Sequence, residues 1–236
     1  MIRKIALAAT LATSVLLLAA CGSHKAASLA PTSRAKTFAD RVDNPWFPLI
    51  PGTTLVYRGI KDGRPSRELL TVTDKKRTIK GVRCTVVRDR LWRSGRLFER
   101  TIDWYAQDAD GNVWYFGEKT AELDENGRVK STEGTWQAGV DGAQEGIFMP
   151  AHPAVGQSFR QEYLKGQAED HFQVLNLSAP VTTPYLTSKH ALLTKEWTPL
   201  EPGVVDHKLY IRGIGTVKEA AVKGSVETNI LVDVRR

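Results

Sequence analysis

The stretch Ile102–Glu118, with the sequence IDWYAQDADGNVWYFGE, constrains the fold more than any other part of the chain. Two runs of large apolar and aromatic residues flank the segment DADGN, whose Asp, Gly and Asn residues favour the backbone conformations of a tight reversal. The pattern predicts a β-hairpin. Trp104 and Tyr105 on one arm lie within strand reach of Trp114 and Tyr115 on the other. We therefore expect cross-strand aromatic pairs to hold the register.

Short alternating or aromatic-rich segments recur on both sides of this hairpin, separated by turn signals such as Asp62-Gly63, Lys80-Gly81 and Ser94-Gly95. No segment has the apolar period of a long helix. The sequence therefore predicts an all-β antiparallel meander. The expected strands are Thr53–Gly59, Leu69–Thr73, Val82–Arg88, Leu97–Gln107, Val113–Phe116, Ser158–Leu164, Asp170–Asn176, Ala191–Thr198, Val204–Arg212, Thr216–Val222 and Val226–Val234.

The two halves of this meander resemble each other weakly. Gly52 and Gly156 are separated by the same distance along the chain as Gly111 and Gly215. A common offset at distant positions indicates a duplicated strand unit, although shared turn residues could also produce it by chance. We expect two curved sheet units, residues 44–132 and 154–236, which form a barrel-like or sandwich body and are joined by a loop at 133–153.

The start of the chain has the pattern of an export signal. Arg3 and Lys4 precede an apolar run, Ile5–Ala20, which is short for a membrane span. The run ends in Leu-Ala-Ala-Cys, which resembles the bacterial lipobox. This resemblance implies cleavage before Cys21 and a lipid, such as palmitate, on its sulfur. An ordinary secretory peptide that happens to contain a cysteine is the alternative.

These features divide the chain into a signal peptide at 1–20, a flexible tether at 21–43 and an all-β domain at 44–236. The tether is rich in Ala, Ser, Lys and Thr and lacks a sustained apolar period. The expected location is the cell envelope outside the cytoplasm, with the membrane as a partner through the lipid on Cys21.

The formal net charge is +7, and about +5 remains without the two cations of the signal peptide. The positive residues form no dense block and are not interleaved with stacking aromatic residues, which argues against nucleic acid as a partner. A mildly basic surface is compatible with an anionic lipid or an envelope polymer.

Cys84 is the remaining thiol when Cys21 carries a lipid, so no disulfide can form within the chain. It is in phase with Val82 and Val86 on one face of a predicted strand. We interpret it as a small buried hydrophobic residue and not as a nucleophile, because no base lies beside it in the sequence.

Three longer segments resemble an uncharacterised family of exported bacterial proteins and lipoproteins. They are NPWFPL with PGTT at 44–54, DWYAQDADGNVWYFGE at 103–118 and TKEWTPLEPGVV at 194–205. The resemblance covers most of the chain after the leader. It implies export and a β-rich fold, and it provides no catalytic residues.

The common signatures of catalysis, of cofactor binding and of metal binding are missing, so we expect neither a cofactor nor a metal. Asp108, Asp110 and Asn112 have the alternating oxygens that open a calcium loop, but no glutamate follows at the required position, which favours a plain turn. Residues 133–153 could bring Asp141 and Glu145 together as an acid and base pair. The alternative is a crossover whose Trp136, Phe148 and Met149 fill the seam between the halves.

Three tryptophans, Trp104, Trp114 and Trp136, could form an exposed platform for a ligand or glycan, or they could be core residues. When the two halves are aligned at their common offset, His207 corresponds to Asp103, which lies next to Trp104 and Tyr105. His207 is therefore the histidine that we consider most relevant to binding.

These observations favour a lipid-anchored envelope protein that binds a small ligand or an envelope partner without catalysis of its own. The ligand is expected between the two sheet units, near Trp136. A glycan hydrolase that uses Asp141 and Glu145 is the first alternative, and a structural or assembly lipoprotein is the second.

Overall fold

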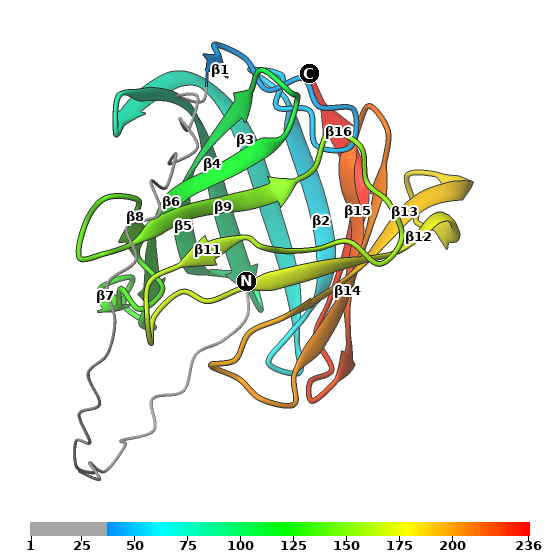
Figure 1. Ribbon diagram of the computed structural model, residues 1–236. Coiled ribbons are helices and arrows are strands. Elements are labelled where there is room, and N and C mark those ends of the chain that lie inside the picture. Colours follow the sequence, from blue (N-terminus) through cyan, green and yellow to red (C-terminus); the bar gives the residue numbers. More distant parts are fainter. Residues whose placement is uncertain (1–36) are drawn as a thin grey trace, which may run out of the picture.

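Residues 37–236, the part of the chain that this computed structural model describes, contain sixteen β-strands and no helix (Figure 1). The strands are β1 (Phe38–Ala39), β2 (Thr54–Lys61), β3 (Arg64–Ile79), β4 (Val82–Arg93), β5 (Arg96–Asp108), β6 (Val113–Leu123), β7 (Val129–Ser131), β8 (Trp136–Gln137), β9 (Gln144–Met149), β10 (Ser158–Arg160), β11 (Glu162–Tyr163), β12 (His171–Thr182), β13 (Thr187–Trp197), β14 (Val205–Ile211), β15 (Gly215–Lys223) and β16 (Thr228–Arg235). The prediction of an all-β fold is confirmed.

All strands belong to one antiparallel sheet that curves into a nearly closed barrel. The main path is β10-β12-β13-β14-β15-β16-β2-β3-β4-β5-β6-β9-β11, while β1 pairs with β5 and both β7 and β8 pair with β6. Its two terminal strands, β10 and β11, are separated in the chain only by Gln161. The ends of the path therefore meet, so few edge groups remain unpaired.

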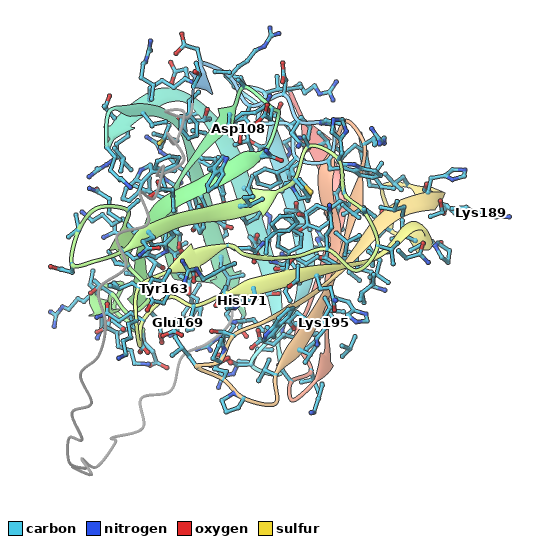
Figure 2. The ribbon with its side chains drawn as sticks, in the orientation of Figure 1. Asp108, Tyr163, Glu169, His171, Lys189 and Lys195 are labelled. Atoms are coloured by element: carbon cyan, nitrogen blue, oxygen red, sulfur yellow. The ribbon has the colours of Figure 1, made fainter. Side chains whose placement is uncertain are left out.

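Tight turns close the long hairpins where the sequence predicts them. Asp62-Gly63, Lys80-Gly81 and Ser94-Gly95 each have positive φ at both central residues, with values between 50° and 80°. This is the backbone of a type I′ turn, whose twist matches that of the flanking strands. The β12–β13 hairpin projects from the barrel, with Lys189 near its tip (Figure 2).

The β5–β6 hairpin has the predicted turn, in which Asp108 Oδ1 accepts hydrogen bonds from the backbone N–H groups of Asp110 and Asn112. Tyr105 and Tyr115 pair across the strands, and their rings stack at 4.7 Å between centroids. The two tyrosines thus form the expected cross-strand aromatic pair, whereas the tryptophans have no aromatic residue opposite them: Trp104 lies opposite Gly117 and Trp114 lies opposite Ala106.

A register shift explains this difference. Trp104 pairs with Gly117 and Tyr105 pairs with Tyr115, so Phe116 is an extra residue in β6. An extra residue of this kind is a β-bulge, which reverses the face that the following side chains point to.

Residues 133–153 differ from the expected loop, because β8 and β9 lie within this segment and β9 pairs with both β6 and β11. The segment therefore supplies part of the barrel wall. The strand order shows a repeated pattern: β2–β6 followed by β9, and β10 with β12–β16, are successive neighbours. The last strand of the second set, β16, pairs with β2, the first strand of the first set. The last strand of the first set, β9, pairs with β11, which follows β10 in the chain. An internal duplication would produce this order, and the duplication itself stays a prediction.

The boundary between tether and body lies earlier than predicted. β1 pairs with β5, and Val42 is buried and bridges to Leu49. Asn44 is also buried, and its Nδ2 donates to the carbonyls of Gly111 and Pro150. Residues 42–49 thus form a cap over the end of the barrel that carries the β5–β6 turn. The predicted signal peptide, Cys21 and the first part of the tether lie outside the described residues.

Cys84 is fully buried, as predicted, and its thiol is free. Burial raises its pKa to about 12, which keeps the thiol protonated and unreactive at neutral pH. Within residues 37–236, no helix has the length and apolar character needed to cross a membrane.

Two glycines allow close backbone contact where the two strand sets meet. A Cβ on Gly59 of β2 would lie 1.8 Å from the carbonyl oxygen of Thr228 in β16. A Cβ on Gly146 of β9 would lie 2.2 Å from the carbonyl oxygen of Arg160 in β10. No side chain fits at these distances, so both junctions depend on glycine.

We predict that Gly146→Ala lowers the free energy of unfolding by about 3 kcal/mol, because the new methyl group forces the backbones of β9 and β10 apart. Urea unfolding measures this loss, with Gln144→Ala as an exposed control on the same strand. Equal stability of the two variants would show that closure at this junction does not need glycine.

Candidate binding cavity inside the barrel

The barrel encloses a cavity of about 760 Å³. Its wall is formed by the inward faces of most long strands, and it extends to the turns at one end, including Asp62, Glu133 and Gly224. Glu133 and Gly224 are exposed, so the cavity reaches the surface at this end. The capped end of the barrel lies opposite. A cavity of this size is in the range of small-molecule sites.

Strand alternation places the lining side chains. Ser66, Glu68 and Leu70 of β3 line the cavity, while the residues between them do not. Asp206 and Lys208 of β14 also line it, and His207 between them does not. Successive residues of a strand point to opposite faces, so polar residues that look solvent-facing in the sequence point inward here.

The bulge in β6 sets the positions of two key residues. Tyr115 precedes Phe116 and Glu118 follows it, and both line the cavity. The register pairs Glu118 with Asp103 of β5, so their carboxyl groups come from directly opposed positions. Tyr115 Oη donates a hydrogen bond of 2.7 Å to Asp103 Oδ1.

Aromatic rings cover part of the wall. Phe47 of the cap packs edge-on against Tyr105 at 5.2 Å, and Phe148 of β9 packs against Tyr105 at 5.0 Å. Trp136 packs edge-on against Tyr115 at 5.3 Å without lining the cavity. The cavity therefore combines an aromatic surface with carboxyl groups beside it.

The lining is rich in acidic residues, in contrast to the positive net charge of the whole chain. Fifteen lining residues are Asp or Glu, whereas three are Lys. Each lysine has a carboxylate partner. Lys61 pairs with Glu227 at 2.6 Å, Lys130 with Glu122 at 2.8 Å, and Lys208 with Glu196 at 2.7 Å and Glu219 at 3.6 Å.

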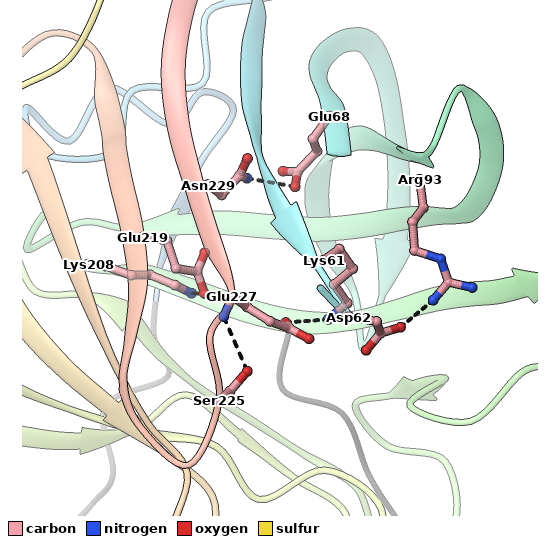
Figure 3. A network of polar contacts seen from close by, with 9 residues as sticks. All are labelled: Lys61, Asp62, Glu68, Arg93, Lys208, Glu219, Ser225, Glu227 and Asn229. Carbon is pink, nitrogen blue, oxygen red and sulfur yellow. Dashed lines mark hydrogen bonds and ion pairs between the residues drawn. The ribbon is translucent and has the colours of Figure 1, made fainter. Parts of the chain in front are cut away.

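Figure 3 shows one part of this network near the open end. Lys61 of β2 donates a hydrogen bond to Glu227, which directly precedes β16. Asp62 forms an ion pair with Arg93. Asn229 Nδ2 donates to Glu68 Oε2 at 2.7 Å. Burial lowers the pKa of Lys208, because it disfavours the charged amine. The carboxylates of Glu196 and Glu219 raise it by more, so the pKa of Lys208 lies well above its usual value.

Four carboxyl groups form a band across four adjacent strands, which we call the carboxyl belt: Glu68 of β3, Asp89 of β4, Asp103 of β5 and Glu118 of β6. Their mutual repulsion is evident in the electrostatics, since Asp89 interacts with Glu68 and Asp103, and Glu118 interacts with Asp103 and with Glu162 of β11. Within residues 37–236, no Lys or Arg forms an ion pair with a member of the belt.

Burial raises the pKa of all four belt carboxyls. The pKa of Asp103 rises to about 7, and hydrogen bonding from Tyr115 opposes the shift without cancelling it. The pKa values of Asp89 and Glu118 lie well above their usual values, through burial first and neighbouring carboxyls second. For Glu68, burial raises the pKa while its hydrogen bond with Asp89 opposes the rise. The empty belt therefore holds protons near neutral pH.

Several buried polar atoms of the lining have no hydrogen-bond partner among the described residues. They are Glu118 Oε2, Gln161 Nε2, Asp170 Oδ1 and Asn229 Oδ1. Glu118 is 5% exposed and Gln161 is 4% exposed. Buried polar groups without partners are costly, and their concentration around one cavity indicates a site for a polar ligand or ordered water.

Chemically, the cavity offers hydrogen-bond acceptors, buried acids and an aromatic wall. Within residues 37–236, no group of three or more His, Cys, Asp or Glu side chains is arranged to hold a metal ion. This arrangement suits the binding of a polar or cationic molecule with apolar parts.

The three tryptophans that were predicted to bind a ligand do not line the cavity. Trp104 is 4% exposed and Trp136 is 3% exposed, so neither can form an exposed platform. Trp104 lies beneath the guanidinium of Arg77 at 4.3 Å. Trp114 is half-buried, and its Nε1 donates to Asp108 Oδ2 at 2.7 Å. The interpretation of these residues as core is the correct one for Trp104 and Trp136.

Asp141 and Glu145 are not brought together at the cavity. Asp141 is exposed in a turn with a φ of 51°, and Glu145 pairs with Lys80 at 2.8 Å. Neither residue lines the cavity. Residues 133–153 do contribute Glu133, Gly134 and Phe148 to its lining. The expected position of a ligand near this segment stays a prediction.

His207 does not take the place of Asp103, because it faces away from the cavity. Burial and the neighbouring Lys195 lower its pKa. The predicted site residues included no member of the carboxyl belt. The signal that could have identified its members is the presence of acidic residues at inward positions of predicted strands, where apolar residues are expected.

No protein-family model matches this sequence, and no curated protein matches it either. The structure is similar to two crystal structures. One is described as "a putative exported protein with YmcC-like fold" from Bacteroides fragilis, with a TM-score of 0.47, 13% identity, and coverage of 81% of this chain and 99% of that chain. The other is "a putative lipoprotein" from Parabacteroides distasonis, with a TM-score of 0.42, 12% identity and the same coverage.

We predict that Asp103→Asn flattens the dependence of stability on pH. Because the folded-state pKa of Asp103 is about 7 and its ordinary value is 3.8, its stabilising contribution is complete below pH 4 and is lost as the pH rises through 7. Asparagine stays neutral and can accept the Tyr115 hydrogen bond. Between pH 5 and 8, the ligand-free wild type should therefore lose on the order of a few kcal/mol relative to the variant.

Urea unfolding at several pH values measures this difference. Asp141→Asn, in an exposed turn, is the matched control and should follow the wild type. If Asp103→Asn and the wild type lose stability in parallel, Asp103 is already ionised in the folded protein.

Proposed function

We propose that this chain is an exported, lipid-anchored binding protein of the cell envelope that holds a small ligand inside its barrel. The observation that carries the proposal is the cavity of about 760 Å³, whose lining contains buried polar atoms that no group in residues 37–236 satisfies. A protein that used its interior only for stability would fill it with apolar side chains. The likeness of the sequence to exported lipoproteins supports the location.

The first described strand shows where the tether joins the barrel. β1 pairs with the end of β5 at Asp108, which places residue 38 at the capped end. The cavity opens among the turns of the opposite end, so the point of attachment does not obstruct the opening.

The geometry favours binding over the glycan hydrolase alternative. Asp141 and Glu145, the expected acid and base, face different surroundings, one in solvent and one in an ion pair with Lys80. General acid and base catalysis needs both groups within reach of one substrate bond. The residues that do converge are the belt carboxyls, and they line a deep cavity within the barrel.

We predict that Ala221→Trp weakens ligand binding at least tenfold, because Ala221 lines the cavity and an indole there occupies the ligand's volume. Ala220→Trp is the matched control, since the adjacent strand position points to the other face. Native mass spectrometry of the protein isolated from envelopes in mild detergent measures the bound compound. Equal occupancy in both variants, with both folded, places the ligand outside the cavity.

We also predict that Cys21→Ser releases the protein from the membrane fraction, because serine cannot take the thioether-linked lipid. Fractionation of cells followed by immunoblotting measures the distribution. Cys84→Ser changes the buried thiol and should leave membrane attachment unchanged. Membrane retention of Cys21→Ser would show that the anchor does not depend on this cysteine.

A further inference from the structure

The unpartnered atoms of the cavity are mainly hydrogen-bond acceptors. Asp170 Oδ1 and Asn229 Oδ1 are acceptors, as is Glu118 Oε2 when its carboxyl group is ionised, whereas Gln161 Nε2 is the donor in this set. The orientation of the Asn229 amide is determined by the hydrogen bond that its Nδ2 donates to Glu68. A molecule that satisfies these atoms must therefore donate several hydrogen bonds.

The charges indicate that this donor is a cation. The lining lysines are already paired with Glu227, Glu122, Glu196 and Glu219. No described cation pairs with the carboxyl belt. A positively charged molecule would gain charge-assisted hydrogen bonds there, and the acidic lining would concentrate it inside the barrel.

The lining also selects the kind of cation. Leu70, Leu91, Phe98 and Phe148 lie among the carboxyl groups. They offer contacts to methylene groups, and aromatic faces attract ammonium groups. Within the described residues, no side-chain cluster suits a metal ion. An organic ammonium compound with aliphatic segments fits this combination of surfaces.

The belt has a linear arrangement, because its carboxyl groups come from four consecutive strands. Neighbouring strands in a sheet lie about 4.7–4.9 Å apart. This spacing is comparable to the separation of two amino groups across a short alkyl chain. We propose that the cavity binds a linear aliphatic polyamine whose ammonium groups lie along Glu68, Asp89, Asp103 and Glu118. This assignment rests on the binding function proposed above.

Binding of the polyamine is coupled to proton release. Burial keeps belt carboxyls protonated in the empty cavity, and an ammonium group favours their charged forms. The affinity therefore increases as the pH rises through about 7. Within the described residues, the other titratable groups that act on the belt are Glu99, Tyr115, Glu162 and Glu219. The three glutamates in this set repel the ionised belt carboxylates, and the belt carboxylates also repel one another. A bound cation offsets this repulsion.

Isothermal titration calorimetry with spermidine tests the assignment. We expect one molecule to bind per chain, with net proton release in buffers of different ionisation enthalpy at pH 7. Glu118→Gln should weaken binding at least tenfold. Glu125→Gln makes the same charge change on an exposed turn and should leave binding unchanged. Asp103→Asn, which preserves the shape of the site, provides a second variant should Glu118→Gln fail to fold.

Equal affinity of the wild type, Glu118→Gln and Asp103→Asn for spermidine would overturn the assignment, as would binding of Ca²⁺ or Mg²⁺ in its place. A different result is that the wild-type protein binds no spermidine but carries a neutral or anionic envelope compound, which Ala221→Trp loses. That result would reject the polyamine and retain the binding function. Failure to bind any compound in either experiment would overturn both proposals.

Discussion

Closure of one antiparallel sheet on itself is the constraint on which the rest of this structure depends. The β16–β2 junction and the contact of β9 with β10 and β11 remove the exposed edges that an open sheet would leave. Both junctions bring backbones so close that Gly59 and Gly146 are needed. Closure also separates an inner face from water, which changes the chemistry of every carboxyl group on that face.

The interior divides into a packed end and a polar end. At the capped end, Asn44 and the aromatic side chains of Trp46, Phe47 and Tyr105 fill the barrel. Toward the opening, Asp, Glu and Lys replace apolar residues, and part of the space stays empty. Keeping buried acids costs stability unless protons, cations or hydrogen bonds compensate them. A site that exchanges protons for a bound cation would give these costly residues a function.

Much of the architecture was accessible from the sequence, because local rules determine it. Period-two alternation predicted most long strands, and the pairs Asp62-Gly63, Lys80-Gly81 and Ser94-Gly95 predicted their turns. β9 was missed, since its sequence QEGIFM lacks alternation. For a different reason, the exposed tryptophan platform, one of two alternatives, is not formed. Whether Trp104 and Trp136 are exposed depends on which segments cover them, and local pattern carries no information about that cover.

The sequence by itself determined an all-β meander, its hairpin turns and the burial of Cys84, because these follow from backbone preferences and alternation between neighbours. The tertiary structure alone decided the candidate site. The bulge at Phe116 places both Tyr115 and Glu118 in the cavity, and closure brings Glu162 of β11 close enough to Glu118 for their charges to interact. Both effects arise from pairing between distant strands, whose register no single segment of the sequence specifies.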